Sequence, residues 1–166
     1  MSIESAQTEI IHGSENQYLS FLLNGEEYGI EILNVQEIKS WVPCTPLPRS
    51  PEYVLGVINL RGAIVPIVDL RAKMNLPAAE MTSTTAVIIV SVEFEQNART
   101  VGLVVDCVSD VYQLMPENIQ AADEGQPVSD RPSCITAYGH IENKLLILIN
   151  LEPIITSTLE ATKETD

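Results

Sequence analysis

The sequence predicts an all-β fold made of two small packed barrels, with short helical turns and one helix near the C-terminal end. Three observations support this prediction. The chain has 166 residues, of which 45% are hydrophobic, so it is long enough to bury a core. Short apolar or alternating runs recur between turn residues, as is typical of strands. One pattern of apolar residues occurs twice, which indicates a duplicated strand-rich unit.

The composition argues against several classes of function. The net charge is -14, from 23 acidic and 9 basic residues, and binding to nucleic acid or to an anionic membrane depends on lysine and arginine. The longest apolar stretches, Val87–Val90 and Leu145–Ile149, are far shorter than the roughly 20 residues of a spanning helix. Met1–Ser14 has no secretory signal pattern. We therefore expect a cytoplasmic protein with no nucleic-acid partner and no direct membrane insertion.

The first expected elements are a hairpin, a helical turn and a loop. Two apolar runs, residues 17–23 and 28–32, flank an Asn-Gly pair, which supplies the positive φ angles of a type I′ turn and predicts a β-hairpin. The apolar period then changes from two to three at Val35 and Ile38, which predicts a short helical turn. Four prolines within residues 42–51 predict an extended loop.

The rest of the chain repeats this alternation of hairpins and short turns. The expected strands are residues 54–60, 63–70, 87–94, 100–105, 134–141 and 144–150. The expected helical segments are residues 71–76, 108–111 and 152–159. The polar run 117–132 is expected to be a loop, and the polar ends, residues 1–16 and 160–166, are expected to be tails.

The duplicated pattern predicts the architecture. At an offset of 73, five residues match five others at identical spacing: Gly29, Ile30, Ile32, Val35 and Ile38 against Gly102, Leu103, Val105, Val108 and Val111. A second match, at an offset of 81, aligns residues 56–70 with 137–151. Two copies predict two closed units, at about 17–77 and 84–151, because closed sheets avoid exposed edges. Exchange of strands between the units and a chance match both remain alternatives. The units should pack together and leave a groove.

The sequence contains no arrangement typical of a catalytic or metal site. Cys44, Cys107 and Cys134 lack CxxC spacing, which predicts reduced thiols rather than a disulfide framework or a zinc site. His12 lies in a tail and His140 beside a turn, so solvent exposure is a simpler role for them than general base. Phosphate-binding and nucleophile-elbow motifs are absent. We expect no cofactor and no metal.

Asp106 and Asp110 are the one acidic pair with a conceivable joint role. Both follow a predicted strand within the repeated turn. Paired catalytic carboxylates need environments that move their pKa values apart, and a hydrolase using this pair is the alternative from another class of function. Two solvated turn aspartates, one of which caps the turn, are the simpler interpretation.

The remaining candidates form an interaction surface. Val35, Ile38, Val108 and Val111 are apolar residues at the expected junction of the barrels, and hydrophobic anchors in a groove bind amphipathic helices. The alternative is that they are ordinary core residues. Arg61, between two strands, either fixes the geometry or meets a partner's carboxylate through charge-assisted hydrogen bonds, or it is a solvated turn residue.

Several blocks of the sequence resemble the CheW family of bacterial chemotaxis coupling proteins. The blocks are Tyr18–Phe21, Glu27–Ile30, Val35–Ile38, Gly56–Gly62, Val65–Arg71 and Gly102–Asp106. The resemblance runs from about Gln17 to Leu159, and its specific part is the GVxNLRG…PxxDLR block. It implies two intertwined five-stranded SH3-like barrels. The loop Trp41–Pro46 matches no motif of the family, which leaves partner specificity open.

The resemblance also implies a function, partners and contact residues. Members of the family are non-enzymatic adaptors that join the cytoplasmic hairpin tip of chemoreceptors, the methyl-accepting chemotaxis proteins, to the regulatory domain of a CheA-type histidine kinase in membrane receptor arrays. The residues that the resemblance implies in the receptor-binding groove are Leu19, Ile32, Val35, Glu37, Ile38, Arg61 and Val108. The first barrel is the side expected to contact the kinase. Within the family, a coupling protein of a related motility or surface-sensing pathway is the alternative.

Overall fold

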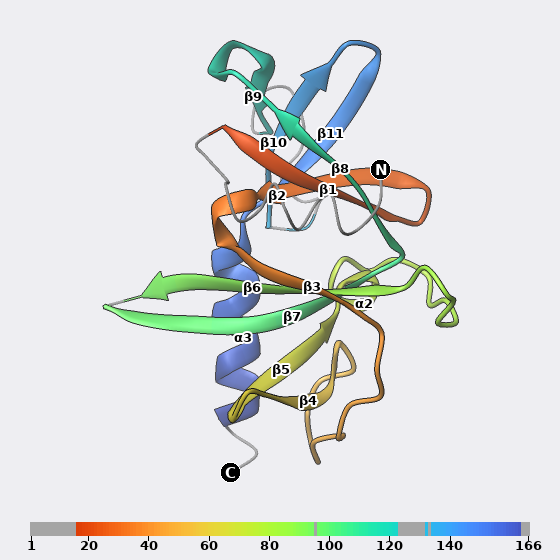
Figure 1. Ribbon diagram of the computed structural model, residues 1–166, viewed down its shortest axis with the longest axis vertical. Coiled ribbons are helices and arrows are strands. Elements are labelled where there is room, and N and C mark those ends of the chain that lie inside the picture. Colours follow the sequence, from red (N-terminus) through yellow and green to blue (C-terminus); the bar gives the residue numbers. More distant parts are fainter. Residues whose placement is uncertain (1–15, 95, 123–131, 133, 164–166) are drawn as a thin grey trace.

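The computed structural model has two β-sheets and a C-terminal helix (Figure 1), and it describes residues 16–94, 96–122, 132 and 134–163. In chain order the elements are β1 Gln17–Leu23, β2 Glu26–Glu31, the 3-10 turn η1 Ile32–Asn34, β3 Val35–Ser40, β4 Val54–Leu60, β5 Ala63–Asp69, α2 Leu70–Lys73, β6 Ala86–Phe94, β7 Asn97–Val105, β8 Cys107–Gln113, the 3-10 turn η2 Pro116–Asn118, β9 Ile119–Ala121, β10 Ile135–Ile141, β11 Lys144–Ile149 and α3 Leu151–Lys163. The predicted all-β class is confirmed. The predicted N-terminal tail lies outside the described residues except for Asn16. Within the described part of the chain, no helix is long and apolar enough to cross a membrane.

All four predicted hairpins form, as β1–β2, β4–β5, β6–β7 and β10–β11. Asn24 and Gly25 have φ angles of 53° and 83°, the positive values that a type I′ turn requires. The closing helix α3 continues to Lys163, so residues 160–163 are helical and do not belong to the predicted tail. The reason is local, because no glycine or proline follows Leu159 to stop the helix.

Each sheet takes strands from both halves of the chain. Sheet A has the order β8-β1-β2-β11-β10-β9, and sheet B has the order β3-β6-β7-β5-β4. The chain leaves sheet A after β2 to place β3 in sheet B, and leaves sheet B after β7 to place β8 in sheet A (Figure 1). The halves 17–77 and 84–151 therefore do not coincide with the sheets. Strand exchange, the open alternative, is what the structure shows, and a periodic pattern cannot reveal it because pairing partners are not local.

Matching contacts show the duplication directly. The offset of 73 relates β2 and β3 to β7 and β8, and the offset of 81 relates β4 and β5 to β10 and β11. Asp69 and Asn150, which are 81 positions apart, each begin a helix by accepting a hydrogen bond from the backbone N–H two residues later. The backbone N–H groups of the same two residues donate to the carbonyls of Tyr53 and Cys134, again 81 positions apart.

Residues 35–38 and 108–111 lie in strands, so the predicted helical turns there are wrong. β3 pairs with β6 and β8 pairs with β1, and each pairing contains a register shift, in β3 between Val35 and Glu37. A bulge adds one residue to a strand, so apolar side chains on one face are then three residues apart instead of two. This spacing imitates a helical period. The helical turn in the first of these regions is η1, directly before β3.

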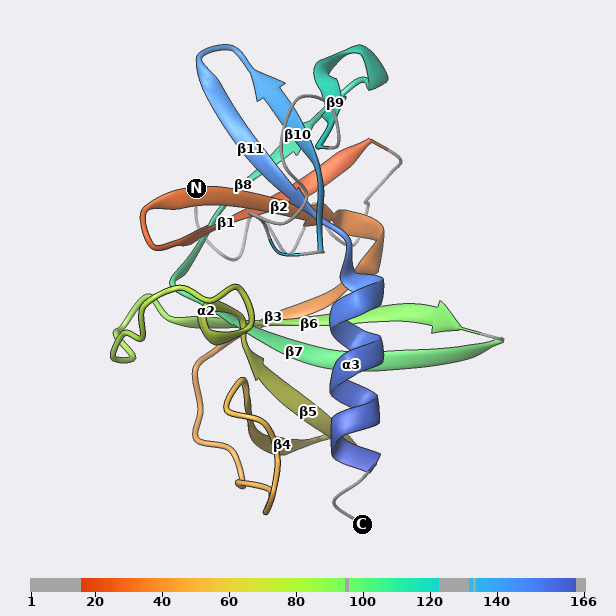
Figure 2. The same ribbon diagram turned by 180° about the vertical axis from the view of Figure 1, so that it is seen from behind.

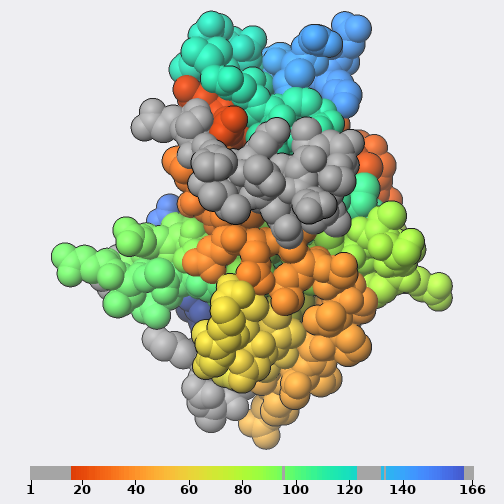
Figure 3. Space-filling model, viewed as in Figure 1, coloured from red at the N-terminus to blue at the C-terminus, as the bar shows by residue number. Residues whose placement is uncertain are grey.

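The proline-rich segment forms the predicted extended loop. Within it Thr45 exchanges two backbone hydrogen bonds with Val57 of β4, at 2.9 and 2.8 Å. The offset of 81 relates Val57 to Tyr138 in β10, which pairs with Gln120 of β9, so Thr45 is the counterpart of the short strand β9. In the space-filling view the loop, in light orange, lies beside the yellow β4–β5 hairpin (Figure 3).

The helix α3 fastens the two sheets together. It directly follows β11 of sheet A, yet it packs against β5, β6 and β7 of sheet B (Figure 2). Its buried residues Leu151, Ile154 and Ile155 belong to a continuous core between the sheets. Full burial of each such side chain contributes about 1.5–3 kcal/mol to stability.

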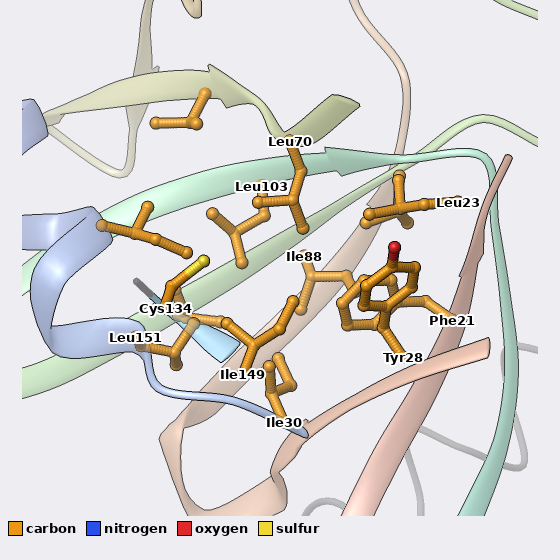
Figure 4. Packing of buried hydrophobic residues seen from close by; sticks show 14 of the residues in the cluster. Phe21, Leu23, Tyr28, Ile30, Leu70, Ile88, Leu103, Cys134, Ile149 and Leu151 are labelled. Carbon is orange, nitrogen blue, oxygen red and sulfur yellow. The ribbon is translucent and has the colours of Figure 1, made fainter. Parts of the chain in front are cut away.

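The core between the sheets combines side chains from both (Figure 4). Phe21, Leu23 and Ile30 come from sheet A, and Ile88 and Leu103 come from sheet B. Each sheet also curls around a smaller apolar cluster of its own on its other face. These clusters contain Val65, Ile67, Val87, Ile89 and Val104 in sheet B, and Leu114, Leu146 and Leu148 in or beside sheet A.

Candidate interaction site at the seam between the sheets

Two edge strands, β3 of sheet B and β8 of sheet A, contribute apolar side chains to the core between the sheets. We call this junction the seam and define it by five residues, Leu19, Val35, Ile38, Val108 and Val111, which all pack in the same cluster. The bulges in β3 and in the β8–β1 pairing allow residues three apart to face the seam together. Four of the seven predicted contact residues, Leu19, Val35, Ile38 and Val108, therefore belong to the same apolar cluster.

Most of the seam is covered. The exposed fraction is 0% for Leu19, 6% for Val35 and 4% for Ile38, whereas Val108 and Val111 are half-buried. Ile32, in η1, is also buried. For Val35 and Ile38 the structure thus shows the alternative that the sequence left open, that of core residues, and their role in receptor binding stays a prediction. They belong to the core, because the bulged edge strands turn them toward the opposite sheet, where burial of apolar surface is favourable.

Glu37 and Arg61 lie on the other face of sheet B, where they form an ion pair. Arg61 Nη2 donates to Glu37 Oε2 at 2.8 Å, and Lys39 Nζ lies 3.7 Å from Glu37 Oε1. Glu37 is on the edge strand β3 and Arg61 is in the turn between β4 and β5, so the pair joins the two edges of the curled sheet. The Arg61 side chain is 70% exposed, and such a surface pair contributes about 0–1 kcal/mol. Arg61 is therefore a tie between elements, and its guanidinium remains accessible to a partner.

Asp106 is held in a two-point ion pair with Arg71. Arg71 Nε donates to Oδ1 and Arg71 Nη2 to Oδ2, both at 2.7 Å, and the backbone N–H of Asn24 donates to Oδ2 at 2.9 Å. These hydrogen bonds, chiefly those from Arg71, lower the pKa of the Asp106 carboxyl. The backbone N–H of Asp110 donates to Ser20 Oγ. A general acid needs a raised pKa, so Asp106 does not fit the role of the acid in the hydrolase alternative.

The Arg71–Asp106 pair was not predicted from the sequence, because only the pairing of the strands shows that these two residues meet. β5 and β7 are parallel, with Asp69 opposite Val104. Arg71 and Asp106 each follow that pair of residues by two positions. The carboxyl ends of parallel strands lie at the same edge of a sheet, so the two side chains meet there.

The remaining titratable candidates do not form a site. The described residues contain no group of three or more His, Cys, Asp or Glu that could hold a metal ion. The three cysteines are free, and burial raises the pKa of each thiol, so they are protonated at neutral pH. His140 is exposed and lies 3.2 Å from Gln120 Oε1. His12 lies outside the described residues.

Comparison with known proteins decides the family. The family model of the CheW-like domain matches residues 17–159. The chain belongs to the CheW-like family. This confirms the resemblance noted in the sequence, and with it the prediction of a non-enzymatic protein.

Relatives and a solved structure are similar over most of their length. The chain is 41% identical to the chemotaxis protein CheW of Klebsiella aerogenes, with 85% of this chain and 82% of the relative covered. It is 37% identical to that of Rhizobium meliloti, with 85% and 88% covered. The crystal structure of the scaffolding protein TtCheW from Thermoanaerobacter tengcongensis superposes with a TM-score of 0.72 at 29% identity, and 82% and 89% of the two chains are covered. The match supports the assignment of two SH3-like barrels.

Proposed function

We propose that this CheW-like chain is a cytoplasmic adaptor that couples the cytoplasmic hairpin tips of chemoreceptors to the regulatory domain of a CheA-type histidine kinase. The observation that carries the proposal is the family match over residues 17–159, together with relatives named chemotaxis protein CheW. The solved neighbour is described as a scaffolding protein, which supports a role in assembly. Recruitment to membrane receptor arrays is part of the proposal.

We place the receptor contact along the seam and the edge of β3. The proposed contact residues are Val108, Glu37 and Arg61, which reach the surface, together with Leu19, Ile32, Val35 and Ile38, which are buried and meet a partner only when the seam opens. An amphipathic helix presents apolar side chains on one face, and Val108, with its neighbour Val111, is the part of the seam that such a helix meets first because it is half-buried. A helix beside the edge strand β3 also reaches the accessible Arg61–Glu37 pair on the other face of sheet B.

We place the kinase contact on sheet B, which holds β3, β4 and β5 of the first half of the chain. Ile64 of β5 and Val42, in the loop that follows β3, are exposed, and the partly buried Trp41 lies beside Val42 in the chain. Exposed apolar and aromatic side chains of this kind form the centres of protein interfaces. Simultaneous small contacts with receptor and kinase would gain strength from the high effective concentration within an array.

Co-sedimentation with a receptor hairpin fragment and with the kinase, separately and together, tests the proposal. Val108→Glu is expected to abolish receptor binding while kinase binding remains. Val108→Thr is expected to weaken receptor binding with little change in the fold. Leu145→Glu is the matched control, because Leu145 is exposed on β11 outside the seam. Wild-type receptor binding by Val108→Glu, with an unchanged melting temperature, would contradict the proposed contact.

A further inference from the structure

The chain crosses between the sheets at two places, and the duplication makes these places equivalent. The first crossing runs through η1, between β2 and β3, and the second runs through Asp106, between β7 and β8. The offset of 73 relates Asp106 to Leu33, and the offset of 81 relates its partner Arg71 to Glu152. The two crossings can therefore be compared residue by residue.

Asp106 joins both sheets at the second crossing. Its carboxylate accepts two hydrogen bonds from Arg71, directly after β5 of sheet B, and one from the backbone of Asn24, in the β1–β2 turn of sheet A. Its own backbone N–H donates to Leu22 O at 3.0 Å, and its carbonyl accepts from Thr84 Oγ1 at 3.0 Å. The side chains of Arg71 and Asp106 are 15% and 30% exposed, whereas Arg61 in the Arg61–Glu37 pair is 70% exposed, so water screens the Arg71–Asp106 pair less.

The first crossing cannot carry the same ion pair. Leu33, the counterpart of Asp106, has no polar side-chain atom and is 60% exposed. Glu152, the counterpart of Arg71, is an acid and is also exposed. Among the described residues, the ion pair at the crossing into β8 therefore has no counterpart at the crossing into β3.

The second crossing adjoins the covered seam. Val108 follows Asp106 by two residues on β8 and pairs with Phe21 of β1. Leu19, Val35 and Ile38 are covered, so a partner that uses them must first move part of the seam. The apparent affinity for such a partner is proportional to the fraction of molecules in the open state, so a small open fraction weakens binding.

We infer that the Arg71–Asp106 ion pair is a clamp that holds the start of β8 in place and thereby limits access to the buried seam residues. The two residues are positioning residues, since neither needs to touch the partner. The clamp itself depends only on contacts within the chain, whereas the identity of the partner rests on the proposed function. Two measurements separate these parts.

The first measurement needs no partner and uses Cys134 as a probe. This thiol is buried directly before β10 of sheet A, and its Sγ lies 3.3 Å from the Sδ of Met74, which follows α2 on the side of sheet B. It therefore reports separation of the sheets near Arg71. In a Cys44→Ser/Cys107→Ser background, Arg71→Ala and Asp106→Asn are each expected to accelerate labelling of Cys134 by a thiol reagent about tenfold, because each removes the charge-assisted hydrogen bonds.

Two controls distinguish a clamp from general destabilisation. The exchanged pair Arg71→Asp/Asp106→Arg is expected to restore much of the slow labelling, because it rebuilds an ion pair at the same place. Leu146→Val, in the separate cluster of sheet A, is expected to lower the melting temperature with little acceleration. Labelling of Arg71→Ala at the wild-type rate, or an acceleration as large in Leu146→Val, would overturn the clamp.

The second measurement is the affinity for a receptor hairpin fragment. If the clamp limits access, Asp106→Asn binds the fragment several-fold more tightly although it melts at a lower temperature, an outcome that a purely structural role does not produce. Weaker binding by Asp106→Asn would overturn the control of access. If the wild-type chain itself fails to bind the fragment, the proposed function fails, and the labelling still decides whether the clamp exists.

Discussion

At the residue scale, the contact between the 42–51 loop and β4 depends on the absence of a side chain at Gly56. A Cβ atom there would lie 2.2 Å from the carbonyl oxygen of Thr45, and Gly56 has a φ angle of 152°. Because the obstructing atoms are backbone, they cannot rotate away as a side chain would. The counterpart of Gly56 in the second half is Ala137. The strand itself therefore tolerates a side chain at this position, and it is the close approach of the 42–51 loop that requires glycine.

Gly56→Ala is expected to lower the free energy of unfolding by about 1–3 kcal/mol, from the clash and from the unfavourable φ. Urea denaturation measures the change. Gly62→Ala is the matched control, since Gly62 also has a positive φ, of 90°, but has open space where a Cβ would lie. Equal losses of unfolding free energy in the two variants would show that the loop moves to accommodate the Cβ atom without further loss of stability.

The ion pair of Asp106 should make the stability of the protein depend on pH. Hydrogen bonds from Arg71 lower the pKa of the Asp106 carboxyl in the folded state, whereas an unfolded Asp has a pKa of about 3.9. Its contribution to stability is therefore present above pH 3.9 and is lost as the pH falls through the lower, folded pKa. The difference in unfolding free energy between wild type and Asp106→Asn should be full at pH 7 and pH 5 and should shrink below about pH 4. A difference that stays constant from pH 7 to pH 2.5 would contradict this account.

At the scale of elements, bulges and prolines decide how the edge strands behave. The bulge in β3 sends Val35 and Ile38 into the core while Gln36 remains exposed. Beside β4, Pro43 and Pro46 have no N–H to donate, so pairing is confined to the single bridge at Thr45. The equivalent strand of the second half, β9, contains no proline and forms a ladder of three residue pairs with β10.

The effect of a charge placed on β3 on the free energy of unfolding should therefore depend on whether the substituted side chain faces the core or the solvent. Val35→Asp buries an unpaired carboxylate and should lower the free energy of unfolding by about 3 kcal/mol or more. Gln36→Asp, one residue later and exposed, should change it by less than about 0.5 kcal/mol. Thermal unfolding of the two variants side by side checks this, and similar melting temperatures would show that Val35 is not a core residue. Loss of partner binding in Val35→Asp alone would accordingly report loss of fold.

At the scale of the whole molecule, strand exchange makes the two sheets one cooperative unit. β3 and β8 each complete the sheet of the other half, and α3 is attached to sheet A while it packs on sheet B. Neither half of the chain can complete a sheet without a strand from the other half, and neither sheet keeps its share of the common core when the other unfolds. The two barrels should therefore lack independent stability.

Unfolding is expected to follow a single transition. The fluorescence of Trp41, the one tryptophan of the chain, reports on the end of sheet B, and far-UV circular dichroism reports on both sheets. In urea the two signals should give the same midpoint. Ile154→Ala, which opens a cavity between α3 and the sheets, should shift both midpoints together and cost about 2–5 kcal/mol. Separate midpoints would indicate two independent barrels.

Sequence alone determined the features that depend on neighbouring residues. The Asn-Gly turn, the four hairpins and the closing helix follow from turn chemistry and periodicity, which act within a few residues. The duplication was also visible, because equal spacing of apolar residues needs no knowledge of pairing. The family resemblance rests on the same local blocks, chiefly the one that contains Arg61.

Tertiary structure alone decided the features that depend on which strands meet. β3 and β8 looked helical because a bulge changes the apolar spacing, and only pairing with β6 and β1 identifies them as strands. For Val35 and Ile38 the sequence left both a groove and the core open, and they lie in the core, since their burial depends on the opposite sheet. Arg71 and Asp106 are 35 positions apart, and only the parallel pairing of β5 with β7 brings their charges together.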